Sequence, residues 1–197
     1  MSMHEHVSHL CKVANFQLRK ISSIRPYLTV DASTQLVCSL VLSRIDYCNS
    51  LLSGLPAEEL ARLQMILHNA ARVIFRQSKR DHVTPLLCKL HWLPVKFRID
   101  YKIATFAYRR FDGSLPPYLS SLLHIYTPSR SLRSSSEKLL RVPKFRTKTF
   151  GQRSFQYQAP SIWNSLPQKI RNATSLSSFK SQLKTHFFKL AYCLGHE

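Results

Sequence analysis

The stretch Leu90–Gly113, LHWLPVKFRIDYKIATFAYRRFDG, constrains the fold more than any other part of the chain. Pro94 stands where the first turn of a helix tolerates proline, and Gly113 stands where a helix ends. Between them apolar residues recur at helical intervals on one face, which predicts a helix packed against a core. That face carries Val95, Ile99, Ile103 and Phe106.

The other faces of this expected helix are aromatic and basic. The aromatic face carries Phe97, Tyr101, Ala104 and Tyr108. The basic face carries Arg98, Lys102 and Arg109. Such a helix has two interpretations. Either its aromatic rings fill a core while the basic stripe is solvated, or the helix faces nucleic acid, with cations on phosphates and the rings of Tyr101 and Tyr108 on bases.

Helical periodicity extends through the first 125 residues. Asp31 is the expected cap of a helix that ends at Gly54, and Pro56 opens the next helix with Glu58 and Glu59 in its first turn. The pattern predicts helices over residues 4–25, 32–52, 56–74, 84–90 and 118–123. Together with the central helix they predict a bundle over residues 1–125.

The segment 126–136, YTPSRSLRSSS, has no apolar period and is expected to be a Ser/Arg-rich linker. A basic extension, residues 137–197, follows it. There 138–142 and 145–150 flank Pro143-Lys144 and are expected to pair as a hairpin. Short helices within 152–167 and a last helix capped by Ser175 complete the extension. The predicted fold class is therefore mainly α, a helical bundle followed by a small basic α+β extension.

The charge of the chain is strongly unbalanced, with 29 Lys+Arg against 10 Asp+Glu and a formal net charge of +19. Glu137 is the only acidic residue from Gly113 to His196, a span that holds 13 Lys and Arg. Such a surface attracts polyanions, most often nucleic acid. The expected phosphate contacts are Arg130, Arg133, Arg141, Lys144, Arg146, Lys148 and Arg153. The alternative for these cations is a solvated surface.

Motifs for enzymatic chemistry are missing from the sequence. Its 4 glycines form no phosphate-binding loop and no Gly-x-Ser-x-Gly elbow, and its aspartates are scattered beside cations. No catalytic residue and no cofactor is expected. An amino-terminal cluster resembles a metal site only superficially, and two Cys-x-x-His pairs lie too far apart in sequence to indicate one. These residues are His4, His6, His9 and Cys11, then Cys88 with His91 and Cys193 with His196.

The 5 cysteines are irregularly spaced, and no apolar region follows the amino terminus as in a secretory signal. The thiols are therefore expected to be reduced, and the compartment to be nucleus or cytoplasm. No apolar run reaches the length of a membrane span, so no membrane association is expected.

Several blocks of the sequence resemble, in order and spacing, the region that follows the catalytic palm in LINE-type non-LTR retrotransposon reverse transcriptases, especially the jockey and chicken-repeat lineages. The resemblance covers nearly the whole chain. The blocks are CKVANFQLRKISSIRPYL (11–28), RIDYCNSLLSGLP (44–56), LHNAARVIFR (67–76), DHVTPLLCKLHWLPVKFRIDYKI (81–103), YTPSRSLRSSS (126–136), RTKTFGQRSFQYQAPSIWNSLP (146–167) and SLSSFKSQLKTHFF (175–188).

The resemblance implies an RNA-directed DNA polymerase as the parent protein, with this chain as its thumb and carboxy-terminal extension. The metal-binding aspartates of that family lie in a Tyr/Phe-x-Asp-Asp motif, and no Asp-Asp pair occurs here. No catalytic residue carries over, so the chain alone is not expected to polymerise DNA. It is expected to hold RNA, DNA or a hybrid duplex through backbone contacts.

Two alternatives remain open beside this nucleic-acid-binding module. One is a helical interaction protein that self-associates, or binds another protein, through faces that a palm domain would cover. The other is a decayed element product without a selected function.

Overall fold

The computed structural model describes residues 2–128, 138–147 and 150–192. It is mainly helical, which confirms the mainly α class predicted from the sequence. Two compact units divide the chain: Met1–Arg98 with Phe188–Glu197 form unit 1, and Ile99–Phe187 form unit 2. In the part of the chain that the structure describes, every helix is too short or too polar to cross a membrane.

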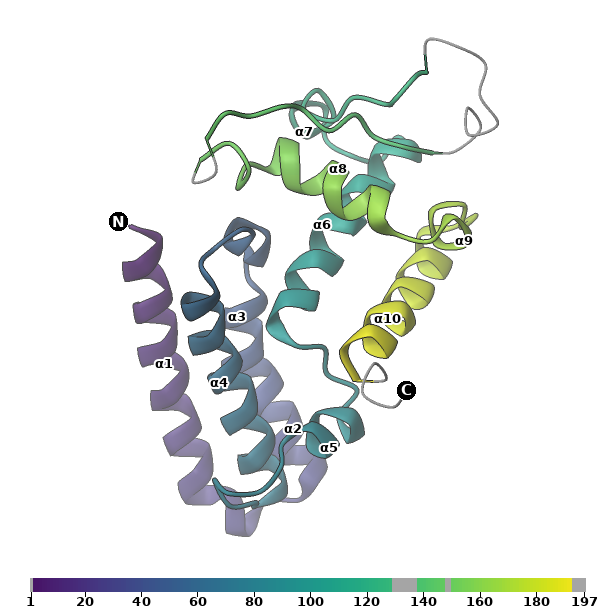
Figure 1. Cartoon of the computed structure of the whole chain (residues 1–197). Helices are drawn as coiled ribbons and strands as arrows, with labels where there is room; N and C mark the ends of the chain where they lie inside the picture. The colour runs from purple at the N-terminus through teal and green to yellow at the C-terminus, as the bar shows by residue number, and fades with distance from the viewer. Residues whose placement is uncertain (1, 129–137, 148–149, 193–197) are drawn as a thin grey trace. The chain divides into compact units, whose positions relative to one another are not determined.

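The first half of the chain contains three long helices, α1, α4 and α6, and several shorter ones (Figure 1). Its elements are α1 (Met3–Ile24), η1 (Arg25–Tyr27), α2 (Val30–Val37), the π-helical η2 (Cys38–Leu42), α3 (Ser43–Asp46), η3 (Asn49–Leu52), α4 (Ala57–Phe75), α5 (Thr84–Lys89) and α6 (Val95–Phe111). The second half carries α7 (Pro117–Ser120), α8 (Phe155–Ser165), α9 (Gln168–Arg171) and α10 (Leu176–Tyr192).

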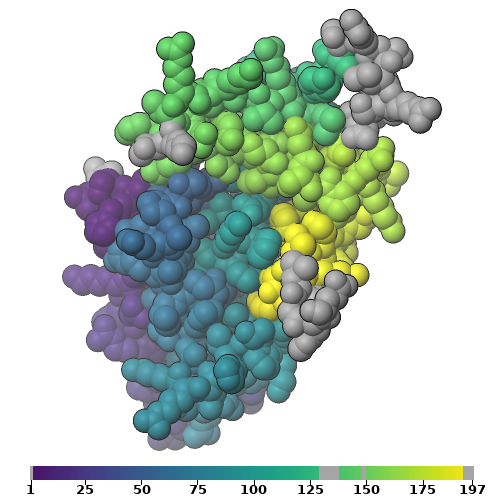
Figure 2. Space-filling view, in the orientation of Figure 1, coloured from purple at the N-terminus to yellow at the C-terminus, as the bar shows by residue number. Residues whose placement is uncertain are grey.

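Helix α1 begins with a capping box. The Ser2 hydroxyl accepts a hydrogen bond from the Glu5 amide at 3.2 Å, and the Glu5 carboxylate accepts one from the Ser2 amide at 2.7 Å. Its apolar face, Val7, Ala14, Leu18 and Ile21, is buried, and α1 packs along α4. In Figure 2 the side chains of α1, in purple, lie against the start of α4, in blue. This packing forms the centre of unit 1.

Arg25 joins the ends of α1 and α4. Its Nε donates to the Ile74 carbonyl at 2.9 Å and to the Val73 carbonyl at 3.2 Å, and its Nη2 donates to the Ile74 carbonyl at 2.5 Å. Nη1 donates to the Leu28 carbonyl at 2.6 Å. The residue is only 6% exposed. A buried guanidinium thus satisfies the Ile74 carbonyl in the last turn of α4 and gives the Val73 carbonyl, which also accepts the Arg76 amide, a second donor. This end of the helix is where the dipole favours a cation.

Gln64 connects α4 to the first turn of α6 within unit 1. Its Oε1 accepts the Val95 backbone N–H at 2.8 Å, which turns its amide NH₂ toward His68 Nε2 at 2.7 Å. His68 therefore accepts this hydrogen bond as a neutral imidazole. Burial lowers the pKa of His68, and the nearby Arg72 charge lowers it further.

Four aromatic side chains form the centre of unit 2. Tyr108 stacks on Phe179 with ring centroids 4.5 Å apart, and Phe111 stacks on Trp163 at 5.1 Å. The rings of Trp163 and Phe179 lie 5.8 Å apart, and both residues are fully buried. These contacts tie the unit 2 parts of α6 and α10 to α8, and they bury large apolar areas at favourable ring geometries.

The central helix was predicted well. Helix α6 follows Pro94 and ends two residues before Gly113, which has a φ of +77°. Val95, Ile99 and Ile103 are buried, as their spacing predicted.

Two predictions about the second helix were wrong. Thr29, and not Asp31, caps it, because the Thr29 hydroxyl accepts the Ala32 amide at 3.2 Å. The helix predicted over 32–52 also ends early, at Asp46, after a π-helical turn at Cys38–Leu42. Cys48 then takes the left-handed conformation, with a φ of 51°, and a separate 3₁₀ turn, Asn49–Leu52, follows it.

The predicted hairpin is not seen in the described residues. Leu140 instead forms an isolated antiparallel bridge with Ile125. The segment 138–142 therefore finds its partner before the predicted linker, and Pro143 separates it from the residues expected to pair with it. The domain boundary at 126–136 stays a prediction, since most of that linker lies outside the described residues.

Replacing Arg25 by Met should lower the free energy of unfolding by about 2–4 kcal/mol, because the carbonyls of Ile74 and Leu28 lose the hydrogen bonds that Arg25 donates. Urea denaturation measures the loss. Arg19→Met, at an exposed position of α1, is the matched control. Equal losses for the two variants would show that the Arg25 hydrogen bonds contribute little.

The stability of the chain should fall as the pH drops below roughly 6.5, the ordinary pKa of histidine. The folded pKa of His68 is lowered, so in this window the unfolded chain binds more protons and unfolding becomes easier. Burial lowers the pKa of His186 as well, which adds in the same direction. His68→Gln should therefore reduce, but not abolish, the loss measured by urea denaturation between about pH 8 and about pH 5. An unchanged loss would exclude His68 as a contributor.

Candidate nucleic-acid interface

Arg141, one of the basic residues expected to meet phosphates, lies on a backbone segment, 138–141, that side chains of α8 and α9 hold in place. Asn164 accepts the Leu140 amide at 3.0 Å and donates to the Leu140 carbonyl at 2.8 Å. Trp163 Nε1 donates to the Lys138 carbonyl at 2.7 Å, and buried Arg171 donates to the same carbonyl at 3.2 Å. The amide side chain of Asn164 thus takes the place of a neighbouring strand.

The other edge of this segment pairs with backbone. The Tyr126 amide donates to the Leu139 carbonyl at 3.0 Å, and the Arg141 amide donates to the His124 carbonyl at 2.8 Å. Leu140 itself is 1% exposed, whereas Arg141 is exposed. The alternation of a strand therefore turns Leu140 into the core of unit 2 and leaves Arg141 at the surface.

Arg141 and Lys144 line one pocket, called here the Arg141 pocket, of about 440 Å³. None of the described residues that line it is acidic. Its cations therefore keep their charge available to an anion. The lining residues are Leu122, His124, Arg141, Val142, Pro143, Lys144 and Gln156.

Exposed aromatic rings accompany these cations in unit 2. Tyr118 is 71% exposed, Tyr126 is 45% exposed and Phe150 is 81% exposed. Tyr126 lies beside the Arg141 pocket, because its backbone pairs with the segment that carries Arg141. Cations interleaved with aromatic rings form the arrangement that holds nucleic-acid backbones and stacks on bases. The sequence does not distinguish these rings from buried ones, since exposure cannot be inferred from a sequence without a clear period.

Arg146 follows a close contact between Phe145 and Gly151. A Cβ on Gly151 would come within 2.5 Å of the Phe145 Cβ, which excludes a larger residue unless Phe145 moves. The Gly151 amide also donates to the Thr147 hydroxyl at 3.1 Å. Arg146 is exposed, and Arg153 is half-buried.

The cations of α6 are placed differently from one another. Arg98, in unit 1, donates to both carboxylate oxygens of Asp46, at 2.9 and 2.6 Å, so its charge is already paired. Lys102 is exposed, with its amine 5.8 Å from the centre of the Phe106 ring. The Nε of Arg109 is buried without a hydrogen-bond partner in the described part of the chain. Lys102 alone of the three is freely presented to solvent.

The two tyrosines proposed to stack on bases lie in or near the core. Tyr108 is 5% exposed, donates to the Ala173 carbonyl at 3.1 Å and stacks on Phe179. Its ring is therefore part of the unit 2 core and is not presented to a base. Tyr101 is half-buried, and its burial raises the pKa of its hydroxyl. The core interpretation of the aromatic face holds for Tyr108.

Three of the predicted phosphate contacts, Arg130, Arg133 and Lys148, lie outside the described residues. Arg171, by contrast, is a cation of the same basic half that the sequence could not distinguish from the others. The structure buries it as a donor to backbone carbonyls of Lys138 and Leu166.

A second group of cations was missed by the sequence analysis. Arg19, Arg72, Arg76 and Lys79 line two adjoining pockets of unit 1. The first half of the chain mixes acids and bases, so its composition gave no reason to select them. The spacing of Arg72 and Arg76, one helical turn apart, was the only signal available.

The residues considered as metal ligands were His4, His6, His9 and Cys11, and the pairs Cys88/His91 and Cys193/His196. In the described ranges no group of three or more His, Cys, Asp and Glu side chains could hold a metal ion. Cys193 and His196 lie outside those ranges. His4 instead lies 2.5 Å from the Glu59 carboxylate, and that hydrogen bond lowers the pKa of Glu59.

Comparison with known proteins adds no assignment: the chain matches no protein-family model, no curated protein and no solved structure.

Asn164→Ala should loosen the 138–141 segment, because the Leu140 amide and carbonyl lose their partner. The expected cost is about 1–3 kcal/mol in free energy of unfolding. Faster hydrogen exchange of the Leu140 amide should accompany it. Ser165→Ala, at the exposed neighbouring position, is the control and should change neither quantity by much. Unchanged exchange at Leu140 would contradict the role given to Asn164.

Proposed function

We propose that the chain is a non-catalytic nucleic-acid-binding fragment derived from the RNA-directed DNA polymerase of a non-LTR retrotransposon. In this proposal the Arg141 pocket and its neighbouring cations contact the backbone of a primer-template duplex, as a polymerase thumb and its extension do. The parent polymerase would supply the catalytic aspartates, which have no counterpart here.

The observation that carries the proposal is the presentation of Arg141 and Lys144. Both line one surface pocket without an acidic neighbour among its described lining residues, on a segment whose backbone is pinned by Asn164. A backbone-contacting surface needs cations whose charge is not already paired. Exposed Arg146 and Tyr126, whose backbone pairs with Leu139, extend this surface.

The sequence supports the same proposal independently. The formal charge of +19 favours a polyanionic partner. Arg141 and Lys144 belong to the carboxy-terminal half of the chain, where Glu137 is the only acidic residue from Gly113 to His196. Phosphate contacts without base readout suit a protein that must hold any sequence. Arg130, Arg133 and Lys148 remain predicted members of the contact set.

A second candidate function is protein interaction or self-association. It is favoured by large apolar side chains that unit 1 leaves exposed: Tyr27 is 88% exposed, Tyr47 is 77% exposed and Leu51 is 67% exposed. Sedimentation without nucleic acid separates the two candidates. Association that depends on protein concentration would favour this second function.

The test of the proposed function is fluorescence anisotropy with an RNA–DNA hybrid, a DNA duplex and a single strand over a salt series. Replacing Arg141, Lys144, Arg146 and Arg153 by Gln should weaken duplex binding similarly for all sequences. The slope of log K against log salt should become shallower by up to about 3.6, at about 0.9 per lost contact.

The control removes the same charge elsewhere. Lys12, Arg44, Lys89 and Lys96 are exposed cations of unit 1, and their replacement by Gln subtracts four charges without touching the Arg141 pocket. If both quadruple variants weaken binding equally, only the net charge matters, and the Arg141 pocket is not the interface.

A further inference from the structure

Unit 1 contains a groove between α1 and α4 that the proposed function does not use. It consists of two adjoining pockets, of about 350 Å³ and about 280 Å³, which share Ser22, Asn69 and Val73. We call it the α1–α4 groove. Its two pockets are near the lower end of the volumes that small-molecule sites occupy, about 300–1,000 Å³. Each is thus suited to a group of about nucleotide size.

Cations surround the groove. Arg72, Arg76 and Lys79 line the larger pocket, and Arg19 lines the smaller one. Arg19, Arg76 and Lys79 are exposed. None of the described residues that line either pocket is acidic. A concave surface lined by one sign of charge concentrates counterions, here anions.

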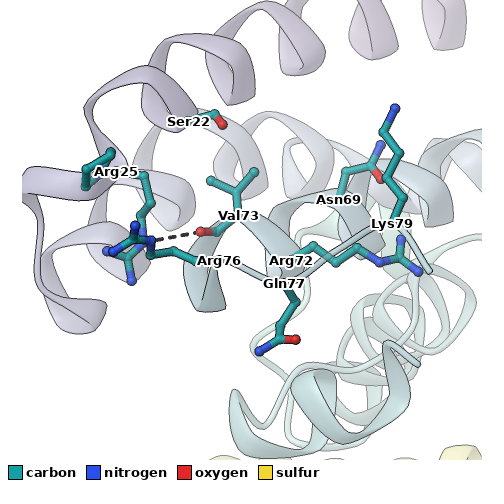
Figure 3. Close-up of a pocket in the computed structure, with 9 residues that line it drawn as sticks. Ser22, Arg25, Asn69, Arg72, Val73, Arg76, Gln77 and Lys79 are labelled. Atoms are coloured by element: carbon teal, nitrogen blue, oxygen red, sulfur yellow. Dashed lines mark hydrogen bonds between the residues drawn. The ribbon is translucent and has the colours of Figure 1, made fainter. Parts of the chain in front are cut away.

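The end of α4 would normally oppose an anion, because its last carbonyls carry the negative end of the helix dipole. Arg25 removes this obstacle. Its guanidinium binds the Val73 and Ile74 carbonyls, and Figure 3 shows the bond to Val73 at the edge of the larger pocket. The described ion pairs do not include Arg25, and its described hydrogen bonds all go to backbone carbonyls, those of Val73, Ile74 and Leu28. The groove therefore has a positive floor as well as positive walls.

The remaining lining groups fit a sugar-phosphate. Asn69 and Gln77 offer amide groups, and Ser22 offers a hydroxyl. Pro26 and Val73 offer apolar surface on which a sugar or the face of a base can lie. A site that combines several cations with amides and a small apolar wall suits phosphate groups joined to an uncharged body.

We propose that the α1–α4 groove binds a single nucleic-acid strand, with one nucleotide and its phosphate in each pocket. The proposal rests on the proposed function only in taking nucleic acid as the ligand. It assigns a second site, in unit 1, whose preference for a single strand differs from the backbone contact proposed for the Arg141 pocket.

The test uses the full chain and a fluorescein-labelled deoxythymidine hexamer with a 5′-phosphate. Replacing Arg19, Arg76 and Lys79 by Gln should weaken binding about tenfold and make the salt slope shallower by about 2, at about 0.7 per contact for a single strand. The control variant replaces Lys12, Arg44 and Lys96, exposed cations that line neither pocket. Equal binding by the two triple variants would overturn the proposal.

Two further measurements identify the ligand and its place. First, binding of the same variants to anionic phospholipid vesicles is measured. If the variant lacking Arg19, Arg76 and Lys79 lost vesicle binding but kept its affinity for the hexamer, the ligand would be a lipid headgroup and the proposal would be overturned. In wild-type chain, the hexamer should shift the backbone NMR signals of Asn69, Arg76 and Gln77. Shifts confined to residues 141–146 would also overturn it, and this result does not depend on any variant folding.

The two proposals fail in different ways. If the Arg141, Lys144, Arg146 and Arg153 variant keeps full duplex affinity while the groove variant loses the hexamer, the proposed function fails and the groove stands. If instead the Arg141, Lys144, Arg146 and Arg153 variant loses duplex affinity while the groove variant keeps its affinity for the hexamer, the groove proposal fails and the proposed function stands.

Discussion

The carbonyl groups at the end of α4 set the strongest constraint on unit 1. A helix must satisfy its last carbonyls, and here a buried arginine from the end of α1 does so. The same bonds fix how α1 and α4 meet, which determines where their cations lie. Arg25 thus stabilises the packing of α1 on α4, and its charge also makes the floor of the α1–α4 groove positive.

In unit 2 a neutral side chain satisfies backbone hydrogen-bonding groups in a similar way. The 138–141 segment has one backbone edge paired near Ile125, and the amide of Asn164 satisfies the other edge. Trp163 supports this arrangement from the aromatic core through its own bond to the Lys138 carbonyl. The core therefore positions the basic surface, because the helix that fills it also holds the segment from which Arg141 projects.

The helices were predictable where one strong local signal decided them. Pro94, Gly113 and the spacing of apolar residues placed α6 almost correctly, because helical hydrogen bonds join residues close in sequence. Predictions failed where two local options competed or the partner was distant. Thr29 and Asp31 both suit a helix cap, and the choice between them depends on how the chain enters the helix. The hairpin prediction failed because Leu140 found a distant partner in Ile125.

The sequence by itself determined the mainly helical class, the excess of positive charge and its concentration in the second half, since these follow from composition and local periodicity. Only the tertiary structure decided which cations are free. Arg171 and Arg141 look alike in sequence, but one is buried on backbone carbonyls and the other is exposed. Likewise Tyr108 fills a core while Tyr126 faces solvent. The physical reason is that burial and hydrogen-bond partners come from residues far apart in the chain, which local sequence patterns cannot specify.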